Sequence, residues 1–227
     1  MKIIIIAATL PEISPLMDRM KYIAGDVDKG NVTFSFKDIH VTFIITGVGM
    51  IATAAETGYH LGKQGYDLVI NAGICGALNT NLKIGEVVNV TKEFLPEFGV
   101  EDHDNFIHGF DMGLANRNVW PFQNGWMELT VDPQVFSNLP KASGITVNTV
   151  HGNATSIVQL RQLVNADIET MEGAGFVRAV RMTTGKAVQI RSISNYVEPR
   201  DKSKWNIPLA IQNLNEVLFD GINACVK

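Results

Sequence analysis

Residues 2–14, "KIIIIAATLPEIS", place an uninterrupted apolar run at 3–8 shortly before Pro11. β-Branched side chains favour strands, and an apolar run without alternation is typical of a strand covered on both faces. Pro11 fits the first turn of a helix, where a backbone N–H has no intrahelical partner. The stretch therefore predicts a buried strand at 2–8, followed at once by a helix at 11–22.

The same alternation of strand and helix continues along the chain. Apolar, β-branched runs predict strands at 41–46, 67–73, 85–90, 145–150 and 187–193, and helical patterns lie at 50–63, 156–164, 172–184 and 207–222. Strands that alternate with helices indicate an α/β fold, and 227 residues suit one domain. We expect a single three-layer α/β domain over residues 1–227, with a central mixed β-sheet flanked by helices.

The composition of the chain excludes several classes of protein. The net charge is −4 and no basic cluster stands out, which argues against a nucleic-acid-binding surface. No apolar run approaches the length of a membrane span, and the N-terminal run is too short for a signal peptide. Cys75 and Cys225 lie far apart, so they suit a reducing compartment and form no metal motif. We therefore expect a cytoplasmic protein that contacts neither nucleic acid nor membrane.

Residues 94–128 are rich in aromatic side chains and show little periodicity. A loop of this length usually forms a lid, a binding loop or an interface between subunits. We expect it to have one of these roles.

The stretch "GVGMIA" at 47–52 matches a fingerprint of dinucleotide-binding proteins. That fingerprint requires an acidic residue at the end of the next strand, where it binds the ribose. Asp67 has about the right separation, but it begins the predicted strand instead of ending it. A dinucleotide-dependent oxidoreductase is therefore one alternative, which the absorbance of a bound cofactor would reveal. The other interpretation is that Gly47 and Gly49 allow a tight turn close to a ligand.

Polar residues and glycines gather where the predicted strands end. Glu12 follows the first strand, "GVG" (47–49) follows the second and "NAGICGAL" (71–78) follows the third. "ETMEGAG" (169–175) opens a helix, and "RSISN" (191–195) ends a late strand. In an open α/β sheet, such strand ends converge on one crevice, so we expect a ligand site there.

Together with "KIGEVV" (83–88), this set of motifs resembles the nucleoside phosphorylase and nucleosidase superfamily over nearly the whole chain. The run "SNYVEPRDKSKWNIPLAI" (194–211) resembles the C-terminal segment of the futalosine hydrolase family within it. The resemblance implies that water cleaves the N-ribosyl bond of a purine nucleoside, without a metal or other cofactor, in a homodimer. For futalosine the products would be hypoxanthine and dehypoxanthine futalosine, in menaquinone biosynthesis.

The resemblance also implies roles for four residues. Glu12 would be the general base that activates the water, with Arg191 beside it. Glu172 would accept hydrogen bonds from the ribose hydroxyls, and Met171 would lie under the sugar, where a thioether tolerates a cationic ring. Taken alone, Glu172 could be only an acid that favours a helix dipole, Glu12 a surface acid, and Arg191 the partner of a structural carboxylate.

Further residues would line the substrate by the same resemblance. The turn formed by Ile74, Cys75 and Gly76 would line the ribose and the water with its backbone, and Gly47 would lie nearby. Taken alone, Cys75 could be a small buried hydrophobe, because no acid–base partner for a nucleophilic thiol is visible.

Thr155 occupies the position of the aromatic residue that stacks on the base in adenine-cleaving relatives, and threonine cannot stack. Phe98, Phe106 and Trp205 are other candidates for that role. Futalosine also carries a carboxyphenyl ketone beyond the ribose, and its carboxylate needs a basic partner. The candidates in the sequence are Arg161, Arg200, Lys202 and Lys204.

The segment around Glu12 also bears on the nucleophile. Phosphorylases of this superfamily carry a Gly-Asp-Pro-x-Arg type of phosphate loop here, whereas this chain has "ATLPEIS" and no arginine before Arg19. Water is therefore the better nucleophile. A phosphorylase of the same fold, which would require phosphate, and a nucleoside-binding module without turnover remain alternatives.

Asn195 stands where adenine-cleaving relatives have an aspartic acid that protonates the purine N7. An amide cannot titrate, but it offers an acceptor and a donor on one plane. A 6-oxopurine needs that pair, because N7–H donates and O6 accepts, whereas adenine would set donor against donor. Asn195 therefore predicts hypoxanthine or guanine as the leaving base, unless it is a turn residue or marks an inactive enzyme.

Overall fold

The structure is a computed structural model that describes residues 1–24, 32–36, 38–129, 134–183 and 186–225. Within these residues one sheet has the strand order β10-β9-β5-β11-β4-β1-β3-β2, and β8 pairs with β5. The strands of this sheet are β1 (Lys2–Ala7), β2 (Val32–Phe36), β3 (Ile39–Ile45), β4 (Leu68–Ala77), β5 (Val87–Phe94), β8 (Met127–Glu128), β9 (Lys141–Thr146), β10 (Ile168–Thr170) and β11 (Lys186–Tyr196).

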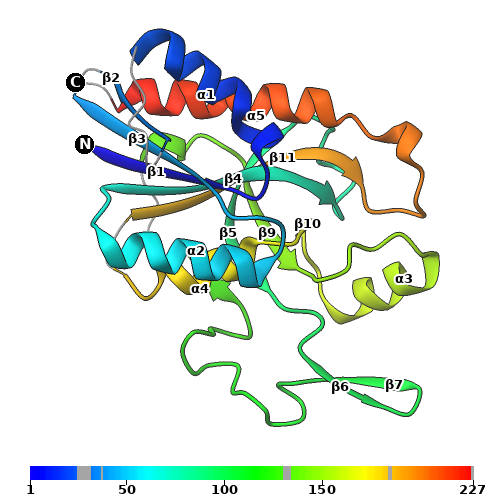
Figure 1. The fold of residues 1–227 in the computed structure, drawn as a ribbon. Coiled ribbons are helices and arrows are strands. Elements are labelled where there is room, and N and C mark those ends of the chain that lie inside the picture. The colour runs from blue at the N-terminus through cyan, green and yellow to red at the C-terminus, as the bar shows by residue number, and fades with distance from the viewer. Residues whose placement is uncertain (25–31, 37, 130–133, 184–185, 226–227) are drawn as a thin grey trace.

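Helices cover both faces of this sheet (Figure 1). The helices are α1 (Leu10–Ala24), α2 (Met50–Lys63), α3 (Ala154–Leu163), α4 (Gly173–Val180) and α5 (Ile207–Ala224), with short 3₁₀ turns at Gln134–Phe136 and Lys202–Lys204. Helices α1 and α5 pack together on one face, α2 and α4 on the other, and α3 lies at the side. The predicted α/β fold with a mixed sheet between helices is therefore confirmed.

The four isoleucines of β1 explain the two layers of helices. Ile3 and Ile5 join the core that contains Leu214 of α5, while Ile4 and Ile6 join the core that contains Val177 of α4. All four isoleucine side chains are fully buried. A strand side-chain period of two sends alternate residues to opposite faces, so only a central strand can bury such a run.

Strand direction places the site. β1 is parallel to β3 and β4, and β4 is parallel to β11, so these four strands end at the same edge of the sheet. The short β10 runs antiparallel to the end of β4, with Glu169 opposite Gly76. This pairing places Met171 and Glu172, which follow β10, beside the last residues of β4.

The observed elements differ from the predicted ones at several places, among them the strand β2, which was not predicted. The strand predicted at 145–150 ends at Thr146, and most of it precedes that range. The loop at 94–128 contains a hairpin of β6 (Gly99–Asp102) and β7 (Asn105–His108). Helix α4 ends at Val180, before the predicted limit, and position 184 lies outside the described residues. None of the described helices is long and apolar enough to cross a membrane.

Candidate active site

The strand ends meet at a pocket of about 390 Å³. Its walls come from the last residues of β4, β10 and β11, from the segments that follow β1, β3, β9, β10 and β11, and from α5. The lining residues are Ala8, Thr9, Pro11, Glu12, Val48, Ile74, Cys75, Gly76, Val150, His151, Glu169, Thr170, Met171, Glu172, Ser194, Asn195, Arg200, Trp205, Ile207 and Ile211. Most of the predicted site residues therefore lie together.

Glu12 projects from the first turn of α1 and is buried. Its Oε2 accepts hydrogen bonds from the Thr9 amide (2.9 Å) and the Thr9 hydroxyl (2.8 Å), and its Oε1 accepts one from the Ile74 amide (3.1 Å). A carboxylate has about four acceptor positions, so roughly one remains for another donor. That position can accept an O–H of water beside residues 74–76, which were expected to form a turn but belong to the end of β4.

Arg191 is a buried cation next to two carboxylates. Its Nη2 donates to Asn71 Oδ1 and lies 3.9 Å from Glu172 Oε2. A Cβ at Gly73 would lie 2.6 Å from Arg191 Nη1 and 2.8 Å from Glu12 Oε1. Glycine at position 73 therefore lets the guanidinium and the Glu12 carboxylate approach the same stretch of β4.

Glu172 is the N-cap residue of α4. Its Oε1 accepts from the Gly49 amide (3.1 Å) and its Oε2 from the Met171 amide (3.3 Å). Gly49 has φ 104°, a conformation that side chains disfavour, so glycine is needed to aim this N–H at the carboxylate. The glycine turn therefore holds Glu172, which supports the interpretation as a tight turn close to a ligand.

The side chain of Asn195 is held in one orientation. β11 has a register irregularity against β4 between Ile193 and Asn195. Asn195 Nδ2 donates to Tyr196 O (3.0 Å), and the Ser194 hydroxyl shares its single proton between Asn195 Oδ1 (2.8 Å) and Cys75 O (3.0 Å). An amide has two N–H groups and two acceptor positions, so one donor and one acceptor remain for a ligand. A Cβ at Gly76 would lie 3.3 Å from Nδ2, so this amide packs against the end of β4.

Cys75 is a buried residue in the wall of the pocket. Burial raises the pKa of its thiol to about 12. The thiolate is the reactive form of cysteine, and it is scarce at neutral pH with such a pKa. The interpretation of Cys75 as a small buried hydrophobe agrees with this environment.

The sequence analysis did not predict a hydrogen-bonded glutamate and histidine in the pocket. Glu169 accepts from the His151 backbone amide (2.9 Å), and its Oε2 is hydrogen-bonded to His151 Nδ1. The hydrogen bond to Glu169 raises the pKa of His151. This contact fixes the ring and leaves Nε2 for another partner. Eighteen residues separate the two side chains, so no local motif marks them.

Three predicted residues stand apart from the lining residues, and one of them is Arg191, which is buried behind the wall of the pocket. Thr155 is exposed in the first turn of α3, where its amide donates to the capping Asn153 (2.9 Å). The helix begins earlier than predicted, with Asn153 as its cap, and this carries Thr155 away from the pocket. Gly47 is not a lining residue, but its neighbour Val48 is. Among the aromatic candidates, Trp205 lines the pocket, whereas Phe98 and Phe106 pack around His108.

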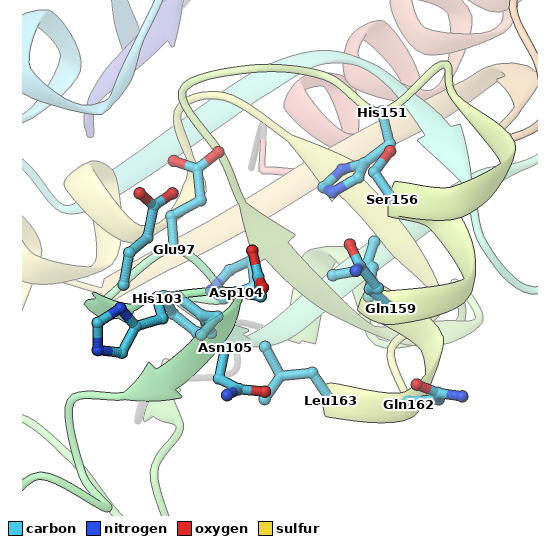
Figure 2. Close-up of a pocket in the computed structure, with 13 residues that line it drawn as sticks. Glu97, His103, Asp104, Asn105, His151, Ser156, Gln159, Gln162 and Leu163 are labelled. Carbon is cyan, nitrogen blue, oxygen red and sulfur yellow. The ribbon is translucent and has the colours of Figure 1, made fainter.

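A larger groove of about 640 Å³ lies between the β6–β7 hairpin and α3 (Figure 2). It shares His151 with the first pocket but contains none of the predicted catalytic residues. Its Glu97 is already bonded to Asn148, through the amide (2.9 Å) and the side chain (2.8 Å). The candidate catalytic residues Glu12, Glu172 and Asn195 therefore line the smaller pocket and not this groove. In the described part of the chain, no group of three or more His, Cys, Asp or Glu side chains could hold a metal ion.

Behind the pocket, Glu93 of β5 is fully buried. It accepts hydrogen bonds from Gln189 Nε2 (2.6 Å) and Thr146 Oγ1 (2.9 Å). Thr146 Oγ1 in turn accepts from the Ala174 amide (2.7 Å), at the start of α4. Burial raises the pKa of Glu93 from its usual 4.5 to about 7, although both hydrogen bonds oppose the shift.

Glu93→Gln is expected to change how stability depends on pH. Below pH 4.5 the carboxyl is protonated in both states. Between 4.5 and 7 the unfolded chain loses this proton first, so folding weakens as pH rises, by about 3 kcal/mol in all. An amide cannot ionise, so the variant should lack this loss. Urea unfolding of both proteins at pH 5 to 8 measures it, with the exposed Glu56→Gln as control, and parallel curves for wild type and Glu93→Gln would contradict the prediction.

Comparisons with known proteins agree with this geometry. The model of the "Phosphorylase superfamily" matches residues 2–221. Futalosine hydrolase from Streptomyces coelicolor is 28% identical over 77% of this chain and 75% of its own length. Futalosine hydrolase from Acidothermus cellulolyticus is 31% identical over 75% of this chain and 70% of its own length.

The fold also matches a solved structure. The native structure of futalosine hydrolase of Helicobacter pylori superimposes with a TM-score of 0.79, at 15% identity, over 98% of this chain and 97% of that chain. At that identity the likeness concerns the fold alone, and the sequence matches carry the relationship. The chain therefore belongs to the phosphorylase superfamily, and within it the chain groups with the futalosine hydrolases.

Proposed function

We propose that this protein hydrolyses the N-ribosyl bond of futalosine and releases hypoxanthine. The relatives named above support the substrate, and the pocket supports the reaction. The observation that carries the proposal is the fixed amide of Asn195, which keeps one donor and one acceptor free in the pocket that holds Glu12 and Glu172. This pair matches O6 and N7–H of a departing hypoxanthine.

Glu172 would stabilise the sugar as the bond breaks. When the C1′–N9 bond breaks, its electron pair goes to the base and positive charge develops on the ribose ring. Glu172 uses one acceptor position on each oxygen for backbone amides, which leaves positions for two ribose hydroxyls. Charge-assisted hydrogen bonds of this kind strengthen as the sugar becomes cationic, so they lower the barrier.

Water is the nucleophile that fits the pocket. A phosphate dianion beside C1′ would be repelled by the carboxylates of Glu12 and Glu172, and the guanidinium of Arg191 donates to Asn71 and lies 3.9 Å from Glu172 Oε2. Arg19 lies elsewhere, with its guanidinium 3.2 Å from the ring centroid of Phe219. Glu12 would accept a proton from the water as its oxygen bonds to C1′, and the base would take a proton from solvent at N7.

We also propose that the protein works as a homodimer in the cytoplasm, as one domain. Large apolar side chains are exposed near the pocket and across the adjoining helices. They include Val48, Ile51, Tyr59, Trp120 and Met182. Such exposed apolar surface favours association with a second copy.

Incubation with futalosine, with and without phosphate, tests the proposed function. We expect hypoxanthine and a free sugar in both samples, at equal rates, because water is the attacking group. Chromatography measures the free base, and a phosphatase step followed by sugar analysis detects any sugar 1-phosphate. A rate that depends on phosphate would identify a phosphorylase, and binding without products would identify a silent nucleoside-binding protein.

A further inference from the structure

The loop at 195–206 bridges the pocket. It leaves β11 at Asn195 and returns beside its own start, where the Asn206 amide donates to Ser194 O (2.9 Å). Midway, the Arg200 amide donates to Gly152 O (3.0 Å), next to His151. Arg200 and Trp205 both line the pocket. The loop that begins at the base-reading amide therefore also carries a cation and an indole ring into the same pocket.

The four basic side chains that are candidates to bind the substrate carboxylate differ in their positions and partners. Lys204 Nζ pairs with Glu198 (2.9 Å) at the surface, and Arg161 donates to Leu78 O (3.1 Å) in a different cavity. Lys202 and Arg200 are both exposed, and Lys202 is not a lining residue. Arg200 lines the pocket, and within the described residues no carboxylate lies within ion-pair distance of it. Its guanidinium instead lies 5.0 Å from the ring centroid of Trp205.

The surroundings of Arg200 favour a flat, anionic ligand. Trp205, Val48, Ile207 and Ile211 supply apolar wall to the pocket, and the indole offers a face on which a ring can stack. A guanidinium without a carboxylate partner presents a fork of N–H donors that fits a carboxylate. An aromatic carboxylate satisfies both features, whereas a neutral sugar end would leave the cation without an anion.

We propose that Arg200 and Trp205 form a subsite for the aromatic carboxylate attached to the sugar, an inference that rests on the proposed function. The guanidinium of Arg200 pairs with the carboxylate, and the indole of Trp205 packs against the phenyl ring. Asn195 would then bind the base, and Arg200 would bind the opposite end of the same molecule.

Three substrates test this subsite: futalosine, its neutral methyl ester, and inosine, which lacks the carboxyphenyl group. Arg200→Gln should lower kcat/KM for futalosine by roughly 10- to 100-fold, mainly through KM, because a hydrogen bond to a charged group is lost. The values for the ester and for inosine should change little. Lys202→Gln is the matched control, because it removes a cation from the same loop without removing a lining side chain.

Other outcomes would overturn the subsite. If Arg200→Gln lowers kcat/KM equally for the acid and the ester, Arg200 does not read the carboxylate. If wild type hydrolyses inosine and futalosine equally well, the nucleosidase function stands and the subsite fails. If wild type hydrolyses none of them, calorimetric binding decides: weaker binding of futalosine, but not of its ester, to Arg200→Gln supports the subsite although the hydrolase proposal fails.

Discussion

Glu12→Gln is expected to lower kcat for futalosine hydrolysis by at least ~100-fold, the usual scale for losing a general base. The amide keeps the size of the carboxyl but cannot accept a proton from the attacking water. The carboxylate of Glu12 accepts on both oxygens, from Thr9 on one and from the Ile74 amide on the other. In glutamine one of these oxygens is replaced by an NH2 group, which would face a donor. KM should change less than kcat, since Glu12 is assigned to the water rather than to the substrate.

Steady-state kinetics and thermal unfolding measure this effect together. Glu56→Gln, which changes an exposed acid of α2, should behave as wild type and serves as the control. If Glu12→Gln retains near-wild-type kcat while it remains folded, Glu12 is not the base. Rescue of the variant by added phosphate would instead indicate that the pocket accepts an anionic nucleophile.

Replacement of Asn195 should alter which base is released. Asn195→Ala should reduce kcat/KM for futalosine by roughly 100- to 1,000-fold, as when a donor to a developing anion is removed. Asn195→Asp is the sharper variant. At neutral pH an ionised carboxylate would repel the charge that grows on O6, and it would also face Tyr196 O, which the native amide satisfies as a donor.

The aspartate variant should therefore recover part of its activity as pH falls, because a protonated carboxyl can again donate a hydrogen bond. It should also shift preference toward 6-amino purines, because a titratable acid can protonate N7. The measurement is the ratio of kcat/KM for a hypoxanthine nucleoside and an adenine nucleoside in both proteins. An unchanged ratio would mean that Asn195 does not distinguish the bases.

The sequence predicted the parts of the site that follow from strand direction. Glu12, residues 74–76, Glu172 and Asn195 all lie just beyond or at the ends of predicted strands, and parallel strands bring such ends together. The observed pocket contains them all. Arg191 was also expected near Glu12, and the two approach each other around Gly73.

The parts that the sequence did not predict depend on contacts between distant residues. His151 meets Glu169, and Glu93 meets Gln189, because of strand pairing that no local pattern specifies. Thr155, which the resemblance assigned to the base, lies in the first turn of α3 and outside the pocket lining, and the Asn153 side chain starts α3 before the expected position. A capping hydrogen bond of this kind determines where a helix begins, and a resemblance to a family does not predict it for one particular sequence.

The space around Glu93 has a consequence for the history of this protein. A Cβ at Gly144 or at Gly173 would overlap Glu93 Oε1, so a side chain at either position would displace the Glu93 carboxyl. Displacement would break its hydrogen bonds to Gln189 and Thr146. We therefore expect these three positions to covary among related proteins.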